Sequence, residues 1–358
     1  MTKYIENMLQ QIGNTPLIKL TKVAKGIKAN VFVKLELLNP SGSYKDRMAI
    51  SMVEAAEKGL TWNGKKLSAH GVVCDASSGN TAPALAFVCA VKGYQAKIGI
   101  YKSLVRKDDI RLKITRIYGA DVIPCPSPTD YMSASEWKKL SKEEKDLSWV
   151  IAGKKWAFDL EKNDPSVVWV DQIYNKYNYM GQMSMGYEIY EQLDGKIDAW
   201  GCSIGSGGTM LGVSLALKEK GVAPLTFGVV PFKTEVYIQF KKGVKEAGKN
   251  DFWFSNAHQK LVGLMNLEKW QTEKSIIEEM FDRGYPEKMF RITDEEARNM
   301  ANRLAQEEGI WCGISSGANV LAALKIAKKL DYGQNVVTVI VDRRDRYLGE
   351  YLHETYVV

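Results

Sequence analysis

The chain has 358 residues, 45% of them hydrophobic, and a formal net charge of +7 from 49 basic and 42 acidic residues. This length and composition can bury a full core and suffice for two modest domains. No apolar segment approaches the roughly 20 residues that cross a membrane, and the dispersed basic residues argue against a nucleic-acid-binding stripe and mildly favour anionic small molecules.

The clustered lysines, the cysteines and the histidines narrow the functional class further. The densest basic cluster contains acidic residues and predicts a solvated loop: Lys241, Lys242, Lys245 and Lys249, with Glu246 and Asp251. The cysteines form no C-x-x-C pair and no metal-ligand spacing, so buried free thiols are expected at Cys74, Cys89, Cys125, Cys202 and Cys312. Their odd number and the lack of a signal peptide favour a reducing, cytoplasmic setting. A metal cluster or a Ser-His-Asp triad is not supported by the scattered His70, His258 and His353.

Strand-like runs alternate with helix-like runs along the chain. The strand-like runs are residues 72–74, 96–101, 122–123, 199–204, 227–230 and 336–341. This alternation predicts an α/β fold with largely parallel sheets.

Lys45 follows a turn-forming segment, and its surroundings are typical of a lysine that forms a Schiff base. Pro40 and Gly42 predict a turn, and the apolar residues after Asp46 have helical spacing, so Lys45 is expected at the start of a helix. A Schiff-base lysine must be neutral to attack an aldehyde, and therefore needs a partly desolvated site that lowers its pKa. Taken alone, the segment is also compatible with a solvated lysine at a helix N-terminus.

Polar loops between a strand-like and a helix-like run occur three times after Lys45. In residues 77–81, hydroxyls and an amide join free backbone N–H groups at a helix N-terminus, a combination that suits a carboxylate. In residues 205–209, three glycines allow the backbone to approach a phosphate closely. Residues 313–318 offer hydroxyls at a third helix start. Ordinary helix caps and a tight turn are the alternatives for these loops.

Taken together in chain order, the Lys45 segment and the three polar loops resemble those of the fold-type II pyridoxal phosphate enzymes, in particular the cysteine synthase and cystathionine β-synthase branch. The resemblance also includes residues 12–17, 33–36, 117–122 and 345–348. It implies a tryptophan synthase β-like fold of two domains, each a mostly parallel twisted sheet flanked by helices. The large cofactor-binding domain would comprise residues 1–44 and 156–358, and a smaller, mobile substrate-binding domain residues 45–155.

The resemblance also implies a role for each motif residue. Lys45 would hold pyridoxal 5'-phosphate as a Schiff base and later shuttle the substrate α-proton. Asn80 would hydrogen-bond the phenolic oxygen of the cofactor, and Ser315 would meet its pyridine nitrogen. The substrate carboxylate would be bound by Ser77, Ser78, Thr81 and Gln172. The cofactor phosphate would be cradled by Gly205, Ser206, Gly207, Gly208 and Thr209. No metal is implied.

The neutral hydroxyl expected at the pyridine nitrogen bears on the reaction. It does not force that nitrogen to stay protonated, so the ring is a weaker electron sink and loss of a β-leaving group is favoured over transamination. The resemblance therefore implies a homodimer that performs β-replacement on a small L-amino acid (serine, O-acetylserine, O-phosphoserine or cysteine) through an aminoacrylate, with a small nucleophile as second substrate. A β-elimination lyase, either a cysteine desulfhydrase or a serine/threonine dehydratase, is the alternative. A cofactor-free binding or regulatory subunit is disfavoured by the intact lysine, asparagine and serine.

The sequence departs from the family in three places. Residues 258–267 replace a glycine-rich loop at the substrate entrance, and the bulkier residues 264–266 are expected to reshape the pocket. Residues 126–168 look longer than usual, with an ordinary surface insertion as the alternative. Before Arg346 and Tyr347, the charged residues 342–345 (Asp, Arg, Arg, Asp) replace small polar residues, and would either add positive charge near the site or pair internally.

Overall fold

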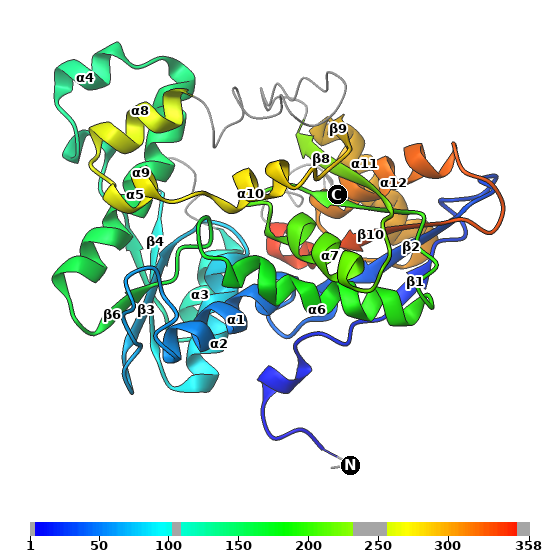
Figure 1. The fold of residues 1–358 in the computed structure, drawn as a ribbon, viewed down its shortest axis with the longest axis horizontal. Coiled ribbons are helices and arrows are strands. Elements are labelled where there is room, and N and C mark those ends of the chain that lie inside the picture. The colour runs from blue at the N-terminus through cyan, green and yellow to red at the C-terminus, as the bar shows by residue number, and fades with distance from the viewer. Residues whose placement is uncertain (1–3, 102–108, 232–255, 349–358) are drawn as a thin grey trace, which may run out of the picture.

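The computed structural model describes residues 4–101, 109–231 and 256–348. The predicted lysine cluster at 241–249 lies outside this part of the chain. Two sheets form the framework, and Figure 1 shows them side by side. The larger sheet has, in spatial order, β1 (Leu17–Lys19), β2 (Asn30–Leu35), β10 (Asn335–Ile340), β7 (Ala199–Ser203), β8 (Leu225–Pro231) and β9 (Lys288–Ile292). The smaller has β5 (Asp121–Pro124), β4 (Gln95–Ile100), β3 (Val72–Ala76) and β6 (Val167–Trp169).

The predicted α/β class with largely parallel sheets is confirmed. Only β1 pairs antiparallel with its neighbour β2, and the other strand pairs in both sheets are parallel. Each strand-like run of the sequence falls on one of these strands. In a parallel sheet the carboxyl ends of the strands meet at one edge, so the loops that follow them are brought together.

Helices cover both faces of the larger sheet. Along β10, Val336 packs into the cluster formed with α11 (Asp294–Glu308) and α12 (Ile314–Ala327). The next residue, Val337, packs on the opposite side with α6 (Tyr177–Gln192), α7 (Gly208–Glu219) and α10 (Ile276–Asp282). This alternation follows from the two-residue period of a strand.

The smaller sheet is covered in the same way. On one face lie α1 (Lys45–Glu57) and α2 (Thr81–Lys92), and α3 (Ile110–Ile117) packs on α2. On the other lies α5 (Lys142–Asn163), with α8 (Asn256–Leu264) and α9 (Glu268–Thr272) beside it. Short α4 (Ala134–Lys139) precedes α5. Single 3-10 turns are η1 (Met8–Gln11), η2 (Glu36–Leu38), η3 (Pro128–Asp130) and η5 (Arg344–Tyr347). No helix in the described ranges has the length and apolar character needed to span a bilayer.

The pairing of β6 with β3 crosses the predicted domain boundary at residue 155. β6 pairs with β3 although it follows residue 155 in the chain, so the smaller sheet takes its last strand from beyond the predicted boundary. The segment 126–168 is not a loose surface loop, because Leu147 and Ile151 of α5 are buried against the sheet. The division into two domains stays a prediction.

The residues expected at the substrate entrance form the end of α8 and the turn after it. Met265 is 1% exposed and packs with Trp169 and Trp270, and Leu264 is partly buried against the same cluster. Met265 therefore contributes to the core beside α5. A role for residues 264–266 in substrate choice stays a prediction.

Candidate active site

Lys45 begins helix α1 at the carboxyl edge of the larger sheet. The turn before it is fixed to the end of β10, because the Tyr44 N–H donates to the Val341 carbonyl at 3.1 Å and Ser43 forms a β-bridge with Asp342. Gly42 has a φ of +88° and accepts the Arg343 N–H at 3.1 Å, which explains the glycine at this position. The lysine thus begins a helix, as predicted, and this helix starts beside the end of β10.

The environment of the Lys45 amine favours its neutral form. Burial lowers the pKa of Lys45 to about 8, and the neighbouring Cys202 thiol offsets this only in part. Its Nζ lies 4.6 Å from the centre of the Tyr44 ring, and no carboxylate among the described residues pairs with it. Roughly one such amine in ten is neutral at pH 7, against about one in three thousand for an ordinary lysine.

The buried lysines in the described part of the chain differ from Lys45 because they have carboxylate partners. Each is paired with a carboxylate: Lys34 with Glu188 at 2.6 Å, Lys154 with Asp75 at 2.6 Å and Lys269 with Asp171 at 2.5 Å. An ion pair favours the protonated amine, which is not a nucleophile. Burial lowers the pKa of Lys34 as well, but Lys34 has a carboxylate partner, so the half-buried Lys45 is the described lysine best suited to attack an aldehyde.

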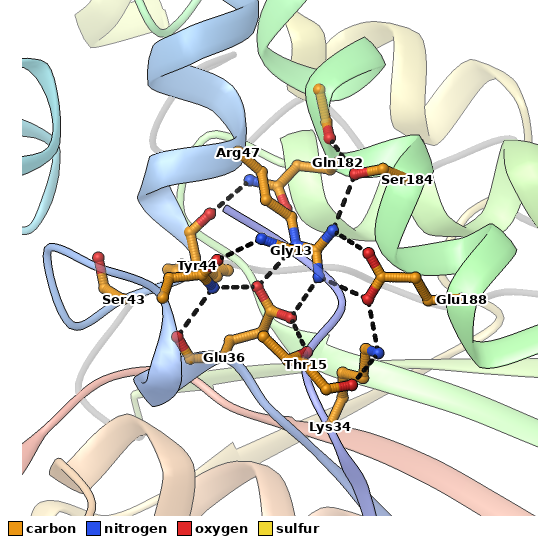
Figure 2. Close-up of polar contacts among 12 residues, drawn as sticks. Gly13, Thr15, Lys34, Glu36, Ser43, Tyr44, Arg47, Gln182, Ser184 and Glu188 are labelled. Atoms are coloured by element: carbon orange, nitrogen blue, oxygen red, sulfur yellow. Dashed lines mark hydrogen bonds and ion pairs between the residues drawn. The ribbon is translucent and has the colours of Figure 1, made fainter. Parts of the chain in front are cut away.

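A buried ionic network anchors the first turn of α1 (Figure 2). The Arg47 guanidinium donates two bonds of 2.8 Å to Glu36, and bonds of 2.7 and 2.8 Å to Glu188 on α6. Burial would lower the pKa of Arg47, but the two carboxylates raise it, and the Arg47 charge holds the Glu36 pKa below its usual range although burial opposes this. The sequence did not reveal this network, because its partners are far apart along the chain.

Further partners of this network lie in two N-terminal segments, 12–17 and 33–36, that are part of the family resemblance. Thr15 donates to Glu36 at 2.7 Å, and Lys34 donates to the Thr15 carbonyl at 2.6 Å. The Gly13 N–H donates to Asn39 at 2.8 Å, and Asn39 donates to Glu36 at 2.7 Å. These segments therefore act on the site indirectly, by fixing the start of the lysine helix.

The loop at residues 77–81 follows β3 and begins α2, as predicted. Ser78 Oγ accepts the Tyr101 N–H at 3.3 Å and Ser77 Oγ accepts the Gly79 N–H at 3.2 Å, so both hydroxyl protons remain available to a ligand. Thr81 donates to Gln172 Oε1 at 2.5 Å. This bond leaves the Gln172 amide N–H groups as donors, and it joins two residues predicted to bind the same carboxylate.

The glycine loop at residues 205–209 connects β7 to α7, so its backbone N–H groups gather at a helix N-terminus. Gly207 has a φ of +85°, and a Cβ at Gly208 would overlap the Asn178 side chain. A Cβ at Gly205 would meet nothing within 4 Å, so open space lies beside this residue. Asn178 donates to Ser206 at 3.1 Å, which helps to hold the loop.

In the third loop, residues 313–318, the neighbouring Ser315 and Ser316 have different surroundings. Ser316 is fully buried, and its Oγ accepts the Val341 N–H at 2.9 Å. Ser315, the second residue of α12, is exposed, and none of the described residues is a hydrogen-bond partner of its hydroxyl. The Ser316 hydroxyl is structural, whereas that of Ser315 is free for a ligand.

Asp342 connects these loops, a role that the sequence reasoning missed. It lies just beyond β10, and its carbonyl accepts the Gly313 N–H at 3.1 Å. Its carboxylate accepts the Asn80 amide at 2.6 Å and the Tyr347 hydroxyl at 2.6 Å. The neighbouring Arg344 is buried against Trp311 and bonds Asn302, so that arginine pairs internally, one of the two expected outcomes.

All five cysteines are buried, as predicted, and none of them forms a disulfide. The ranges that the structure covers contain no group of three or more His, Cys, Asp or Glu residues placed to hold a metal ion.

These residues fit pyridoxal phosphate. An unpaired amine with a lowered pKa suits its aldehyde, and the open space at Gly205 beside the α7 N-terminus suits its phosphate. A free hydroxyl at Ser315 suits a neutral ring nitrogen. The fold and the site define an α/β protein in which a lysine of lowered pKa and a glycine-rich helix start follow strands of the same sheet.

Comparisons with known proteins identify the family. Residues 8–342 match the family model described as pyridoxal-phosphate dependent enzyme. The chain is 31% identical over 353 residues to a cysteine synthase of Staphylococcus aureus, covering 98% of each. A hydrogen sulfide-producing enzyme from Fusobacterium nucleatum is similar in structure, with a TM-score of 0.73 and 27% identity over 97% of this chain and 99% of that chain. An O-acetylserine dependent cystathionine β-synthase from Helicobacter pylori also has a TM-score of 0.73, with 25% identity over 97% and 98%.

The chain therefore belongs to the pyridoxal-phosphate dependent enzyme family. It is an enzyme of fold type II, of the cysteine synthase group, and pyridoxal phosphate is its cofactor.

The glycine loop gives a direct test of phosphate binding. If this loop holds the cofactor phosphate, Gly205→Asp is expected to weaken pyridoxal phosphate binding at least ~10-fold, about 1.4 kcal/mol, because its carboxylate would repel the phosphate. Absorbance titration of the apoenzyme measures this affinity. Gly205→Ala is the matched control and should bind nearly as the wild type does, since a Cβ there meets nothing. Unchanged affinity in Gly205→Asp would mean that the loop is only a turn.

Proposed function

We propose that the protein catalyses β-replacement on a small L-amino acid that carries a leaving group at its β-carbon. The observation that carries this proposal is the half-buried Lys45, whose amine has a lowered pKa and no carboxylate partner among the described residues, at the sheet edge where the glycine- and hydroxyl-rich loops begin. When bound, pyridoxal phosphate supplies an electron sink for negative charge at the substrate α-carbon.

Each site residue has a proposed role in this reaction. Lys45 holds the cofactor, and its amine then moves the proton at the substrate α-carbon as a general base. Asn80 contacts the phenolic oxygen and Ser315 the ring nitrogen. The substrate carboxylate is oriented by Ser77, Ser78, Thr81 and Gln172. The phosphate is held by Gly205, Ser206, Gly207, Gly208 and Thr209.

The substrate class is proposed from the relatives. Their names include a cysteine synthase and an O-acetylserine dependent cystathionine β-synthase, which supports serine, O-acetylserine, O-phosphoserine or cysteine as the amino acid. The hydrogen sulfide-producing relative supports the alternative, β-elimination from cysteine. We further propose a cytoplasmic homodimer with a smaller substrate-binding domain between the two parts of the larger one.

Product analysis tests this proposal. The cofactor-loaded enzyme would be incubated with each of the four amino acids, with sulfide or homocysteine as the nucleophile, while amino-acid products, sulfide and pyruvate are measured together. We expect a new sulfur amino acid to exceed pyruvate for at least one pair. Pyruvate alone would favour the lyase, and no turnover of any serine or cysteine derivative would overturn the proposal.

A further inference from the structure

The Asn80 side chain is held between two charged groups. Its Nδ2 donates to Asp342 Oδ2 at 2.6 Å, and its Oδ1 accepts from the Arg346 guanidinium at 2.6 Å. Both bonds involve a charged partner and are therefore stronger than neutral ones. A flipped amide would turn its carbonyl toward the carboxylate and its amino group toward the cation. The two charges thus select a single orientation of the amide.

This orientation determines what Asn80 offers to a ligand. The amide nitrogen carries two N–H groups, and Asp342 occupies one of them. The second N–H remains as a donor, while the carbonyl is directed to Arg346. In the proposed site Asn80 faces the phenolic oxygen of the cofactor, where a donor stabilises negative charge and a carbonyl would oppose it.

The Asp342 carboxylate is fixed by hydrogen bonds, but its burial lowers the stability of the fold. Its side chain is 1% exposed, and Tyr347 donates to the same Oδ2 that accepts from Asn80. The other oxygen, Oδ1, has no hydrogen-bond partner within the described part of the chain, although it is buried. A buried carboxylate with an unsatisfied oxygen lowers the stability of the fold, so its presence at this position calls for a functional reason.

The backbone around Asp342 places this carboxylate at the centre of the site. On one side Ser43 forms a bridge with it, two residues before Lys45. On the other side its carbonyl accepts the Gly313 N–H, two residues before Ser315. The side chain then reaches across to Asn80 at the N-terminus of α2. One residue just beyond β10 therefore links the three segments proposed to contact the cofactor ring.

We propose that Asp342 is a positioning residue that fixes the Asn80 amide so that its N–H faces the phenolic oxygen of bound pyridoxal phosphate. Arg346 completes this arrangement from the carbonyl side. The inference rests on the proposed contact between Asn80 and the cofactor. It assigns the buried carboxylate a function in setting the charge of the cofactor oxygen, beyond its contribution to the fold.

The absorbance spectrum of the bound cofactor tests this inference. Losing a donor at the phenolic oxygen should move the cofactor from its long-wavelength band, in which that oxygen is negative, to its short-wavelength band. We expect Asn80→Ala and Asp342→Asn each to lower the ratio of the two bands about 5-fold, which corresponds to about 1 kcal/mol. Because Asp342 acts through Asn80, the double variant should match Asn80→Ala alone.

Two further variants separate positioning from general damage to the fold. Ser316→Ala disturbs the same strand end without touching Asn80, so it should lower the unfolding temperature and keep the band ratio within 2-fold of the wild type. If Asp342→Asn does not fold, Arg346→Met releases the amide from the other side and should lower the ratio similarly.

The possible outcomes are distinct. A wild-type protein without a borohydride-reducible adduct on Lys45 would overturn the proposed site itself. A wild-type spectrum in Asp342→Asn or Arg346→Met, while Asn80→Ala is shifted, would overturn only the positioning role. Additive effects in the double variant, or no shift in Asn80→Ala, would overturn the inference as well.

Discussion

Lys45→Ala is expected to form no borohydride-reducible adduct with pyridoxal phosphate. The substitution removes the amine that has a lowered pKa and no carboxylate partner, and no other described lysine combines these two features near the glycine loop. Turnover should fall by at least about 10²–10⁴-fold, the range that a positioned proton-transfer group supplies. Borohydride reduction followed by peptide mapping measures the adduct, and product formation measures turnover.

Lys45→Arg is the matched control for the charge of this side chain. It keeps a cation at the start of α1, but a guanidinium stays protonated and does not form the Schiff base, so it should be as inactive as Lys45→Ala. Lys154, which is buried next to the loop at residues 77–81, is the strongest competitor for the label. Label on Lys154 in the wild type would show that the nucleophile has been assigned wrongly.

The sequence predicted those features of the fold and the site that depend on a local pattern of residues. The strand-like runs, the helix start at Lys45 and the loops before α2, α7 and α12 depend on neighbouring residues, and the structure has each of them. Parallel strands place such loops at one edge of a sheet, so the gathering of the site follows from the order of the elements. The buried cysteines could be predicted for the same reason, because they lie in apolar runs.

The remaining features depend on contacts between distant residues. Arg47 and Glu188 are 141 positions apart, and Asn80 and Asp342 are 262 apart, so no periodicity relates them. Residues 258–267 contain a single glycine, Gly263, where a glycine-rich entrance loop is expected, but only the packing beside α5 shows that Met265 enters the core. The sequence shows residue 342 only as one of four charged residues at 342–345, whereas the structure shows that its carboxylate connects the loops of the site.

Arg47→Met is expected to lower the free energy of unfolding by about 3–5 kcal/mol, the cost of breaking a buried ion pair. Arg47 is 2% exposed, and its loss leaves the fully buried Glu36 carboxylate and that of Glu188 without their shared cation. Urea unfolding of the wild type and the variant at pH 7, with the same saturating cofactor concentration, measures this cost, because bound ligand itself adds to stability.

The dependence of this cost on pH tests its electrostatic origin. Burial would raise the pKa of Glu188, but Arg47 and Lys34 lower it to about 2, so the stability that this carboxylate provides is present above its unfolded pKa near 4.5 and is lost as the pH falls toward 2. The difference between wild type and Arg47→Met should therefore shrink on acidification below pH 5. Arg303→Met is the matched control, because the Arg303–Glu307 pair on α11 is solvent-exposed and its loss should change the stability little. A similarly small cost for Arg47→Met would mean that packing, and not the buried charges, holds the lysine helix in place.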